Sequence, residues 1–255
     1  MSHNHLYING CSFTKGHILP EEHSWPFLLQ KELDLSQNYE NKSQNANSIG
    51  SIVGKTVKDN VNSEKDTLAV IGLTWPTRYS LHIEKYLFNV GPSRYESDDD
   101  GDFGEIRRPI YLDDDDAYDN PTDFFGFVKE KTPSYREIFK SFGKFIKTHI
   151  KYDDNFVDNQ YFYDRLLVHL LESYFISKNI DYIFIEFENS LRLTGKLNIF
   201  RPLNTENYLF LKLDDDKFVE AHPSKEQCII IKDKIIKKIE KLYPKYLKSN
   251  QLNLF

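Results

Sequence analysis

The hydrophobic pattern along the chain predicts several strands of a buried sheet. Residues 67–74 (Thr-Leu-Ala-Val-Ile-Gly-Leu-Thr) form a continuous apolar run, which is typical of a strand covered on both faces in a parallel sheet. Leu6 to Asn9 and Asp181 to Phe187 are two further, mostly apolar strands, and Tyr39 to Ser43 is a fourth candidate. Residues 188–217 are predicted to be irregular.

Apolar residues at helical spacing predict helices between and after these strands. The predicted helices span Glu21 to Leu33, the residues that follow the turn-rich stretch 45–51 as far as Val61, Ser134 to Ile150, Asn159 to Lys178, and Lys225 to Leu242. The apolar face of the fourth helix is assigned to Leu166, Leu167, Leu170, Leu171 and Tyr174, and that of the last to Ile229, Ile230, Ile236 and Ile239. Ser224 and Gln227 have the spacing of a capping box at the start of the last helix. This alternation predicts an α/β fold, a three-layer α/β/α sandwich with a mostly parallel sheet.

Residues 75–133 interrupt the alternation and are interpreted as an insertion in a single domain that spans residues 1–255. Arg78 to Val90 is predicted to form a pair of strands, and two acidic runs follow, at 98–102 and 113–116. A calcium loop of the EF-hand type is excluded, because Pro109 stands at the twelfth position where a glutamate is needed. A solvated acidic loop is the preferred interpretation.

The overall charge and the cysteine count exclude several classes of protein. A net charge of −6 argues against a nucleic-acid-binding protein, whose surface is expected to be basic. Two cysteines do not make a disulfide framework, and the apolar runs are too short to span a membrane. With no secretion signal at the start, a cytoplasmic protein is expected. No cofactor and no metal site are expected, since the histidines at 3, 5, 17 and 23 lack a metal-ligand spacing.

Candidate chemistry appears where the first strand ends. Gly10 permits a sharp exit from the strand, and Ser12 is expected on the loop that follows it. Ligands of open α/β sheets bind beyond the carboxyl ends of the strands, so Ser12 stands where a reaction can take place. His222, near the other end of the chain, precedes a helix and is a candidate base for this serine. Cys11 is not expected to share the site, because neighbouring side chains of an extended chain point to opposite sides.

Four blocks in this order resemble the SGNH/GDSL hydrolases, and most closely a divergent branch with a Gly-Cys-Ser-Phe block that is often found in phages. The blocks are Gly10-Cys11-Ser12-Phe13, Asn47-Ser48-Ile49-Gly50, Ile71-Gly72-Leu73-Thr74 and His222-Pro223-Ser224. The resemblance implies a flavodoxin-like arrangement of the sheet, Ser12 as nucleophile and His222 as base. It also implies that the backbone N–H groups of Ser12 and Gly50 stabilise the oxyanion. The implied substrate is an ester, either a small molecule or an O-acetyl group on a glycan, and a virion or the host cytoplasm is an alternative location if a phage encodes the protein.

Three positions depart from the pattern of this family. Cys11 stands where the family has aspartate, and Thr74 stands where an asparagine side chain usually completes the oxyanion hole. The acidic partner of the histidine is usually three residues before it, which is Val219 here. Glu220 is the nearest substitute and Asp216 a weaker one, or a backbone carbonyl orients a Ser–His dyad.

Two interpretations stay open at this point. Arg78 is expected either to contact an anionic or hydroxylated part of the substrate, or to form a salt bridge with the acidic insertion. The alternative to a serine hydrolase is a non-catalytic SGNH-like module that binds a glycan or a protein. The fold of an α/β-hydrolase is rejected, because its elbow requires glycine at the position of Thr14.

Overall fold

A computed structural model describes most of the chain except two long stretches, 91–155, of which it describes only residues 106–111, and 188–202. The described residues are 4–16, 18–35, 38–44, 47–59, 61, 66–74, 79–83, 86–90, 106–111, 156–187, 203–212, 218–219 and 222–247. The acidic runs, the predicted helix 134–150, Glu220 and Arg78 lie outside them.

A five-stranded sheet forms the centre of the molecule. Its strands are β1 (His5–Asn9), β2 (Tyr39–Asn41), β3 (Thr67–Gly72), β7 (Asp181–Phe187) and β8 (Tyr208–Leu211), in the spatial order β2-β1-β3-β7-β8. All four pairings are parallel. The central strand β3 is buried along its whole length, as its continuous apolar run predicts.

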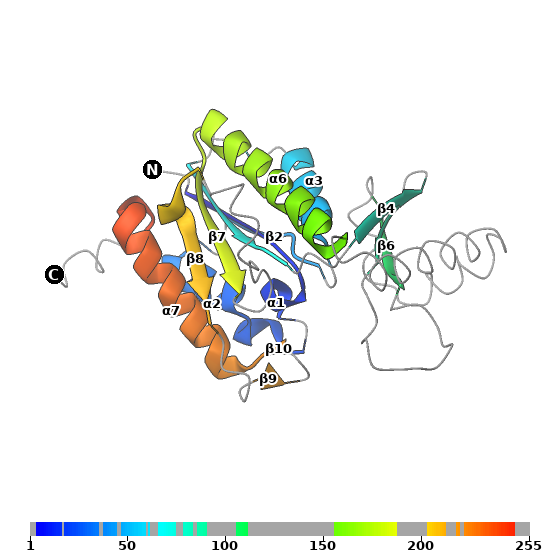
Figure 1. The fold of residues 1–255 in the computed structure, drawn as a ribbon. Helices are drawn as coiled ribbons and strands as arrows, with labels where there is room; N and C mark the ends of the chain where they lie inside the picture. Colours follow the sequence, from blue (N-terminus) through cyan, green and yellow to red (C-terminus); the bar gives the residue numbers. More distant parts are fainter. Residues whose placement is uncertain are drawn as a thin grey trace.

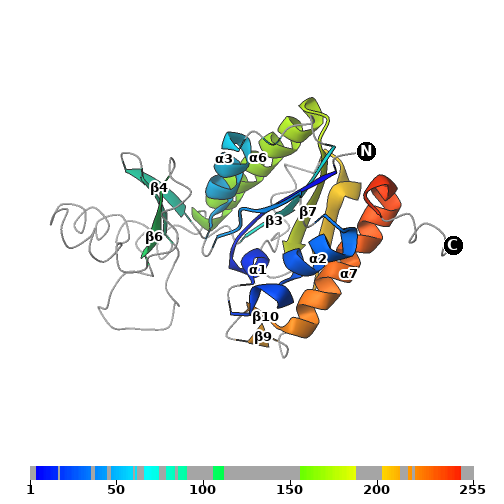
Figure 2. The same cartoon turned by 180° about the vertical axis from the view of Figure 1, so that it is seen from behind.

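Helices cover both faces of this sheet, so the predicted three-layer α/β/α sandwich is confirmed (Figures 1 and 2). On one face, α2 (Trp25–Leu33) and α7 (Lys225–Leu242) pack against each other; on the other, α3 (Ile49–Lys58) packs against α6 (Phe156–Ser177). Alternate side chains of β1 divide between the two cores: Leu6 and Ile8 face α2 and α7, whereas Tyr7 faces α3 and α6.

Capping residues decide where two of the helices begin. α7 begins as predicted, with both hydrogen bonds of the Ser224–Gln227 capping box formed. The predicted start of α2 at Glu21 is wrong: Glu21–His23 form a short 3₁₀ turn, and α2 begins only at Trp25. Ser24 is extended and its hydroxyl accepts the N–H of Phe27, which makes it the N-cap.

Two predicted helix faces and one predicted loop need correction. Leu170, which was assigned to the core, is 53% exposed, and Ile229 and Ile230, which were assigned to the apolar face of the last helix, are each 40% exposed. The predicted residues Leu171, Ile236 and Ile239 are buried, and the core also contains Val168 and Phe175 of α6 and Ile231 and Ile235 of α7. The range 188–217 was predicted to be irregular, but it contains β8, the edge strand that pairs with β7.

Two smaller sheets lie outside the central one. β4 (Tyr79–Ile83), β5 (Tyr86–Val90) and β6 (Ile106–Tyr111) form an antiparallel sheet, so the strand pair predicted within residues 78–90 is confirmed. β9 (Phe218–Val219) pairs antiparallel with β10 (His222–Pro223), and this short pair carries His222.

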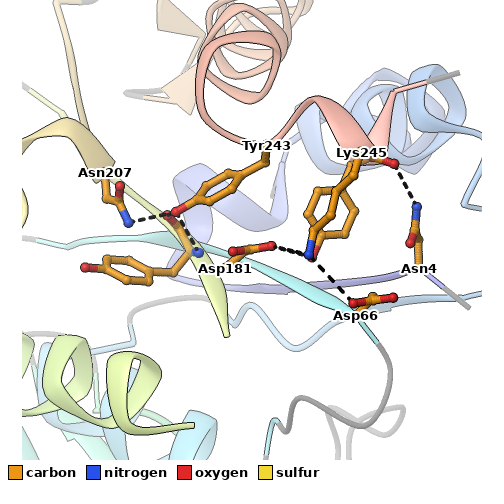
Figure 3. A network of polar contacts seen from close by, with 8 residues as sticks. Asn4, Asp66, Asp181, Asn207, Tyr243 and Lys245 are labelled. Carbon is orange, nitrogen blue, oxygen red and sulfur yellow. Dashed lines mark hydrogen bonds and ion pairs between the residues drawn. The ribbon is translucent and has the colours of Figure 1, made fainter. Parts of the chain in front are cut away.

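The residues that directly follow α7 are tied to the amino ends of the strands by a polar network (Figure 3). Lys245 Nζ lies 2.9 Å from Asp181 Oδ2 and 3.6 Å from Asp66 Oδ1. The Tyr246 hydroxyl donates to Asp181 Oδ2 at 2.9 Å, and Asn4 donates to the Lys245 carbonyl at 3.2 Å. This network therefore occupies one end of the sheet and leaves the carboxyl end to other residues.

Candidate active site

The carboxyl end of β1 and β3 is where the predicted site residues emerge from the sheet. Asn9, the last residue of β1, is in register with Ile71 of β3. Ser12 and Thr74 each follow three residues later, so both leave the sheet at the same end. α1 (Ser12–Lys15) and β10 lie beyond this end in Figures 1 and 2.

Ser12 is the first residue of a short helix, α1, and not part of a loop as predicted. The side chain of Thr14, in this helix, packs directly against Gly10 and Gly72. A Cβ atom on Gly10 would lie 2.2 Å from Thr14 Oγ1, and one on Gly72 would lie 2.0 Å from the same atom. Both distances are far below van der Waals contact, so the two glycines permit the close approach of α1 to the strand ends.

Two further contacts fix the position of α1. The Trp25 indole N–H donates to the carbonyl of Phe13 at 3.2 Å, from a tryptophan that is completely buried. Gly16 ends the helix in the left-handed conformation (φ 73°), and its N–H donates to the Ser12 carbonyl at 3.0 Å. The backbone around Ser12 is therefore held from both sides.

Asn47 ties the start of α3 to the strand that leads to Ser12. Its side-chain amide donates to the Gly10 carbonyl at 2.9 Å, and its own oxygen accepts the Ser51 hydroxyl at 3.3 Å. Ser48 caps α3, which places Gly50 in the first turn, where helix N–H groups have no intrahelical acceptor. Sequence reasoning gave Asn47 no role, although it begins the second block of the family resemblance.

His222 reaches the same end of the molecule from the far end of the chain. β10 packs against α1, and the imidazole centroid lies 5.5 Å from the ring centroid of Phe13, the residue after Ser12. The structure thus brings Ser12, Gly50, Thr74 and His222 to the carboxyl end of the sheet. Their catalytic roles stay predictions, as do those of Glu220 and Arg78.

Ser12 and Cys11 are both buried, and this burial limits access to the serine. Ser12 is 1% exposed, so a substrate reaches its hydroxyl only if the residues around it move. Cys11 packs in the core with Leu6 and Ile8, on the side of α2 and α7. Burial also raises the pKa of the Cys228 thiol to about 11, which keeps it protonated and unreactive at neutral pH.

A buried ion pair near the end of β7 was missed by sequence reasoning. Arg165 of α6 contacts Glu186 Oε1, and the two side chains are only 8% and 4% exposed. Burial raises the pKa of the Glu186 carboxyl, and the positive charge of Arg165 opposes that rise. A glutamate inside the otherwise apolar run 182–187 was the signal that could have revealed it.

No family model matches this sequence, and no curated protein matches it. The comparison with solved structures does find similar chains. One is the psychrotrophic esterase EstA from Pseudoalteromonas sp., in a structure inhibited by monoethylphosphonate, with 12% identity, 94% of this chain and 97% of that chain covered, and a TM-score of 0.46. Another is a carbohydrate esterase whose active site is described as having divergent catalytic and non-catalytic binding functions (11% identity, 97% and 68% covered, TM-score 0.46). A third is a member of the lipolytic G-D-S-L protein family from Veillonella parvula DSM 2008 (11% identity, 94% and 98% covered, TM-score 0.32).

One of these matches is thus described as a member of the G-D-S-L family, the family that the four blocks resemble. The membership of a phage-associated Gly-Cys-Ser-Phe branch stays a prediction.

The described part of the chain also bears on metals and membranes. Within it, the histidines, cysteines and acidic residues form no group of three that could hold a metal ion. None of its helices combines the length and the apolar character that crossing a bilayer requires.

Proposed function

We propose that this chain is a serine hydrolase of the SGNH/GDSL type that cleaves an ester. The observation that carries the proposal is the meeting of α1 and β10, because residues 210 positions apart in sequence place Ser12 and His222 at one end of the sheet. A serine and a histidine at the carboxyl end of a parallel sheet are the two groups that acyl transfer needs first.

The proposed reaction begins with attack of Ser12 Oγ on the ester carbonyl while His222 accepts the hydroxyl proton. Negative charge then develops on the carbonyl oxygen, and the N–H groups of Ser12 and Gly50 and the Thr74 hydroxyl are its proposed donors. His222 returns the proton to the departing alcohol. Water, deprotonated by the same histidine, then releases the acid and restores Ser12.

The burial of Ser12 supports a small acyl group in this proposal. Ser12 is 1% exposed, so every acyl group requires the surrounding residues to move, and an acetyl group requires less movement than a long acyl chain. An O-acetyl group on a glycan or on a small molecule is therefore the proposed substrate. We expect the protein to hydrolyse p-nitrophenyl acetate at least 10-fold faster, as kcat/KM, than p-nitrophenyl octanoate, an energy difference of about 1.4 kcal/mol in the transition state.

The experiment that tests the proposal is hydrolysis of p-nitrophenyl acetate by the purified protein and by a Ser12→Ala variant. The variant should lose the activity, and its melting temperature should stay close to that of the wild type. Ser173→Ala is the matched control, since the Ser173 hydroxyl donates to the His169 carbonyl within α6 and should not affect turnover. Activity that survives in Ser12→Ala would rule out Ser12 as the nucleophile.

The burial of Ser12 also favours a second function, because a serine that a substrate does not reach cannot act as a nucleophile. This second function is a non-catalytic module that binds a glycan or a protein. Thr74 in the place of the oxyanion asparagine points in that direction as well. Isothermal titration with an acetylated and a deacetylated oligosaccharide separates the two functions. A binding module should bind without releasing acetate, whereas the hydrolase should release acetate in the calorimeter cell.

A further inference from the structure

The aromatic residue that follows Ser12 contacts the candidate base directly. The Phe13 ring centroid lies 5.5 Å from the His222 imidazole, with 46° between the ring planes. Aromatic rings at this separation, tilted in this way, attract each other beyond the effect of burial alone. The contact also acts on a charged imidazole, because the face of an aromatic ring attracts a cation.

A second ring supports Phe13 from the sheet. Phe187, the last residue of β7, lies 5.3 Å from Phe13 between centroids, with 53° between the planes. Phe13 is 6% exposed and Phe187 is 4% exposed, whereas His222 is only half-buried. The ring that touches the histidine is thus better fixed than the histidine itself.

The backbone of Phe13 is fixed as well. Its carbonyl accepts the Trp25 indole N–H, and Thr14, the next residue, rests on Gly10 and Gly72. A side chain with a held backbone and a packed ring has little rotamer freedom left. Because Phe13 is fixed relative to α1 and Ser12, its ring limits the positions that the His222 imidazole can take relative to Ser12.

We propose that Phe13 is a positioning residue that sets the orientation of the His222 imidazole toward Ser12. The inference rests on the proposed function, because orientation matters for catalysis only if His222 acts as the base. Position 219, which pairs with His222 across the β9–β10 ladder, holds a valine. A carboxylate at that position therefore does not orient this histidine, and the ring contact supplies an orienting element.

The test compares Phe13→Leu with Phe175→Leu. Phe175 is also buried, stacks on Tyr182 at 5.4 Å, and lies in the core on the opposite face of the sheet. The two variants lose the same ring atoms, so both should lose stability. Only Phe13→Leu should lower kcat for p-nitrophenyl acetate, by about 10- to 100-fold with KM within about twofold, because a small misplacement of a catalytic group is costly.

NMR of the imidazole protons gives a readout that does not need activity. The His222 Hε1 and Hδ2 resonances can be assigned by their loss in His222→Gln. The ring current of Phe13 should displace them, and Phe13→Leu should move them, whereas Phe175→Leu should leave them in place. If Phe13→Leu does not fold, Phe187→Leu removes the supporting ring and should move the same resonances by a smaller amount.

The two proposals fail in different ways. Unmoved His222 resonances in Phe13→Leu, or the same kcat in both leucine variants, would overturn the role of Phe13. Activity that persists in Ser12→Ala would instead overturn the proposed function, while the resonances would still show whether Phe13 holds the imidazole.

Discussion

At the scale of single residues, the site depends on positions where nothing larger than glycine fits. Gly10 and Gly72 come from different strands and both lie against Thr14. The sequence shows them only as members of two short blocks, because the contact that requires Gly72 joins it to Thr14, 58 positions earlier in the chain. Sequence reasoning could therefore find the candidate residues but not the reason for their spacing.

Gly72→Ala should disturb the site without abolishing the fold. The added Cβ would lie 2.0 Å from Thr14 Oγ1, so Thr14 must shift, at a cost of about 1–3 kcal/mol in the free energy of unfolding. Esterase turnover should fall by about 10-fold or more, since Thr14 belongs to the same short helix as Ser12 and its shift displaces that helix. Chemical denaturation and kcat measure the two effects.

Gly54→Ala is the matched control for this variant. Gly54 lies on the exposed side of α3, and a Cβ there would meet nothing within 4 Å. Alanine is the better helix former, so this change should raise the free energy of unfolding by about 0.5–1 kcal/mol and leave turnover unchanged. Equal loss of activity in both variants would contradict the account of Gly72.

At the scale of secondary-structure elements, the sequence predicts what local rules determine. The strands β1 and β3 follow from apolar runs, and α7 follows from its capping box, because each signal lies within the element itself. The start of α2 was predicted wrongly because the N-cap signal of Ser24 was not used, and the exposure of Leu170 on α6 depends on neighbours distant in sequence. β8 was missed although its four residues, Tyr208 to Leu211, are a continuous apolar run, because a run this short lies inside a stretch that otherwise shows no strand pattern.

The contact between α6 and β7 offers a second prediction, through the Arg165–Glu186 pair. Arg165→Met should lower the free energy of unfolding by about 3–5 kcal/mol, because it leaves a buried carboxylate without its partner. The loss should shrink at acidic pH. The raised pKa of Glu186 means that the folded state binds this proton more tightly than the unfolded state, so stability falls as pH rises through that pKa.

The double variant Arg165→Met with Glu186→Leu provides the comparison. It removes both charges and fills the space with apolar atoms, so its stability at neutral pH should be close to that of the wild type or above it. Thermal unfolding across a pH series measures both effects. A double variant that is less stable than Arg165→Met alone would show that the pair contributes more than charge neutralisation.

At the scale of the whole molecule, the two ends of the sheet carry different groups of residues. At the amino end, Lys245 and Tyr246 bind Asp181 and so hold the residues after α7 against the sheet (Figure 3). The carboxyl end carries Ser12 and His222. The layered architecture was predictable from the alternation of strands and helices, whereas the meeting of the chain's first and last blocks required the fold itself.

Tyr246→Phe should therefore affect stability alone. The Tyr246 hydroxyl donates to the Asp181 carboxylate, and losing a hydrogen bond to a charged group costs about 1.5–3 kcal/mol. Lys245→Ala should cost less, about 0–1 kcal/mol, since that lysine is about half exposed and its ion pair is screened by water. Turnover per folded molecule should be unchanged in both variants. A fall in kcat at constant folded fraction would contradict this division between the two ends.

The most direct measurement of the central claim is covalent labelling of the intact protein with a fluorophosphonate, followed by peptide mapping. A serine activated by a histidine attacks phosphorus and displaces fluoride, and the phosphonyl group then stays on the serine oxygen. The account predicts one label per chain, located on Ser12, absent in Ser12→Ala and formed at least about 100-fold more slowly in His222→Ala. A label on another residue, or no label on folded protein, would contradict the assignment of Ser12 and His222 as nucleophile and base.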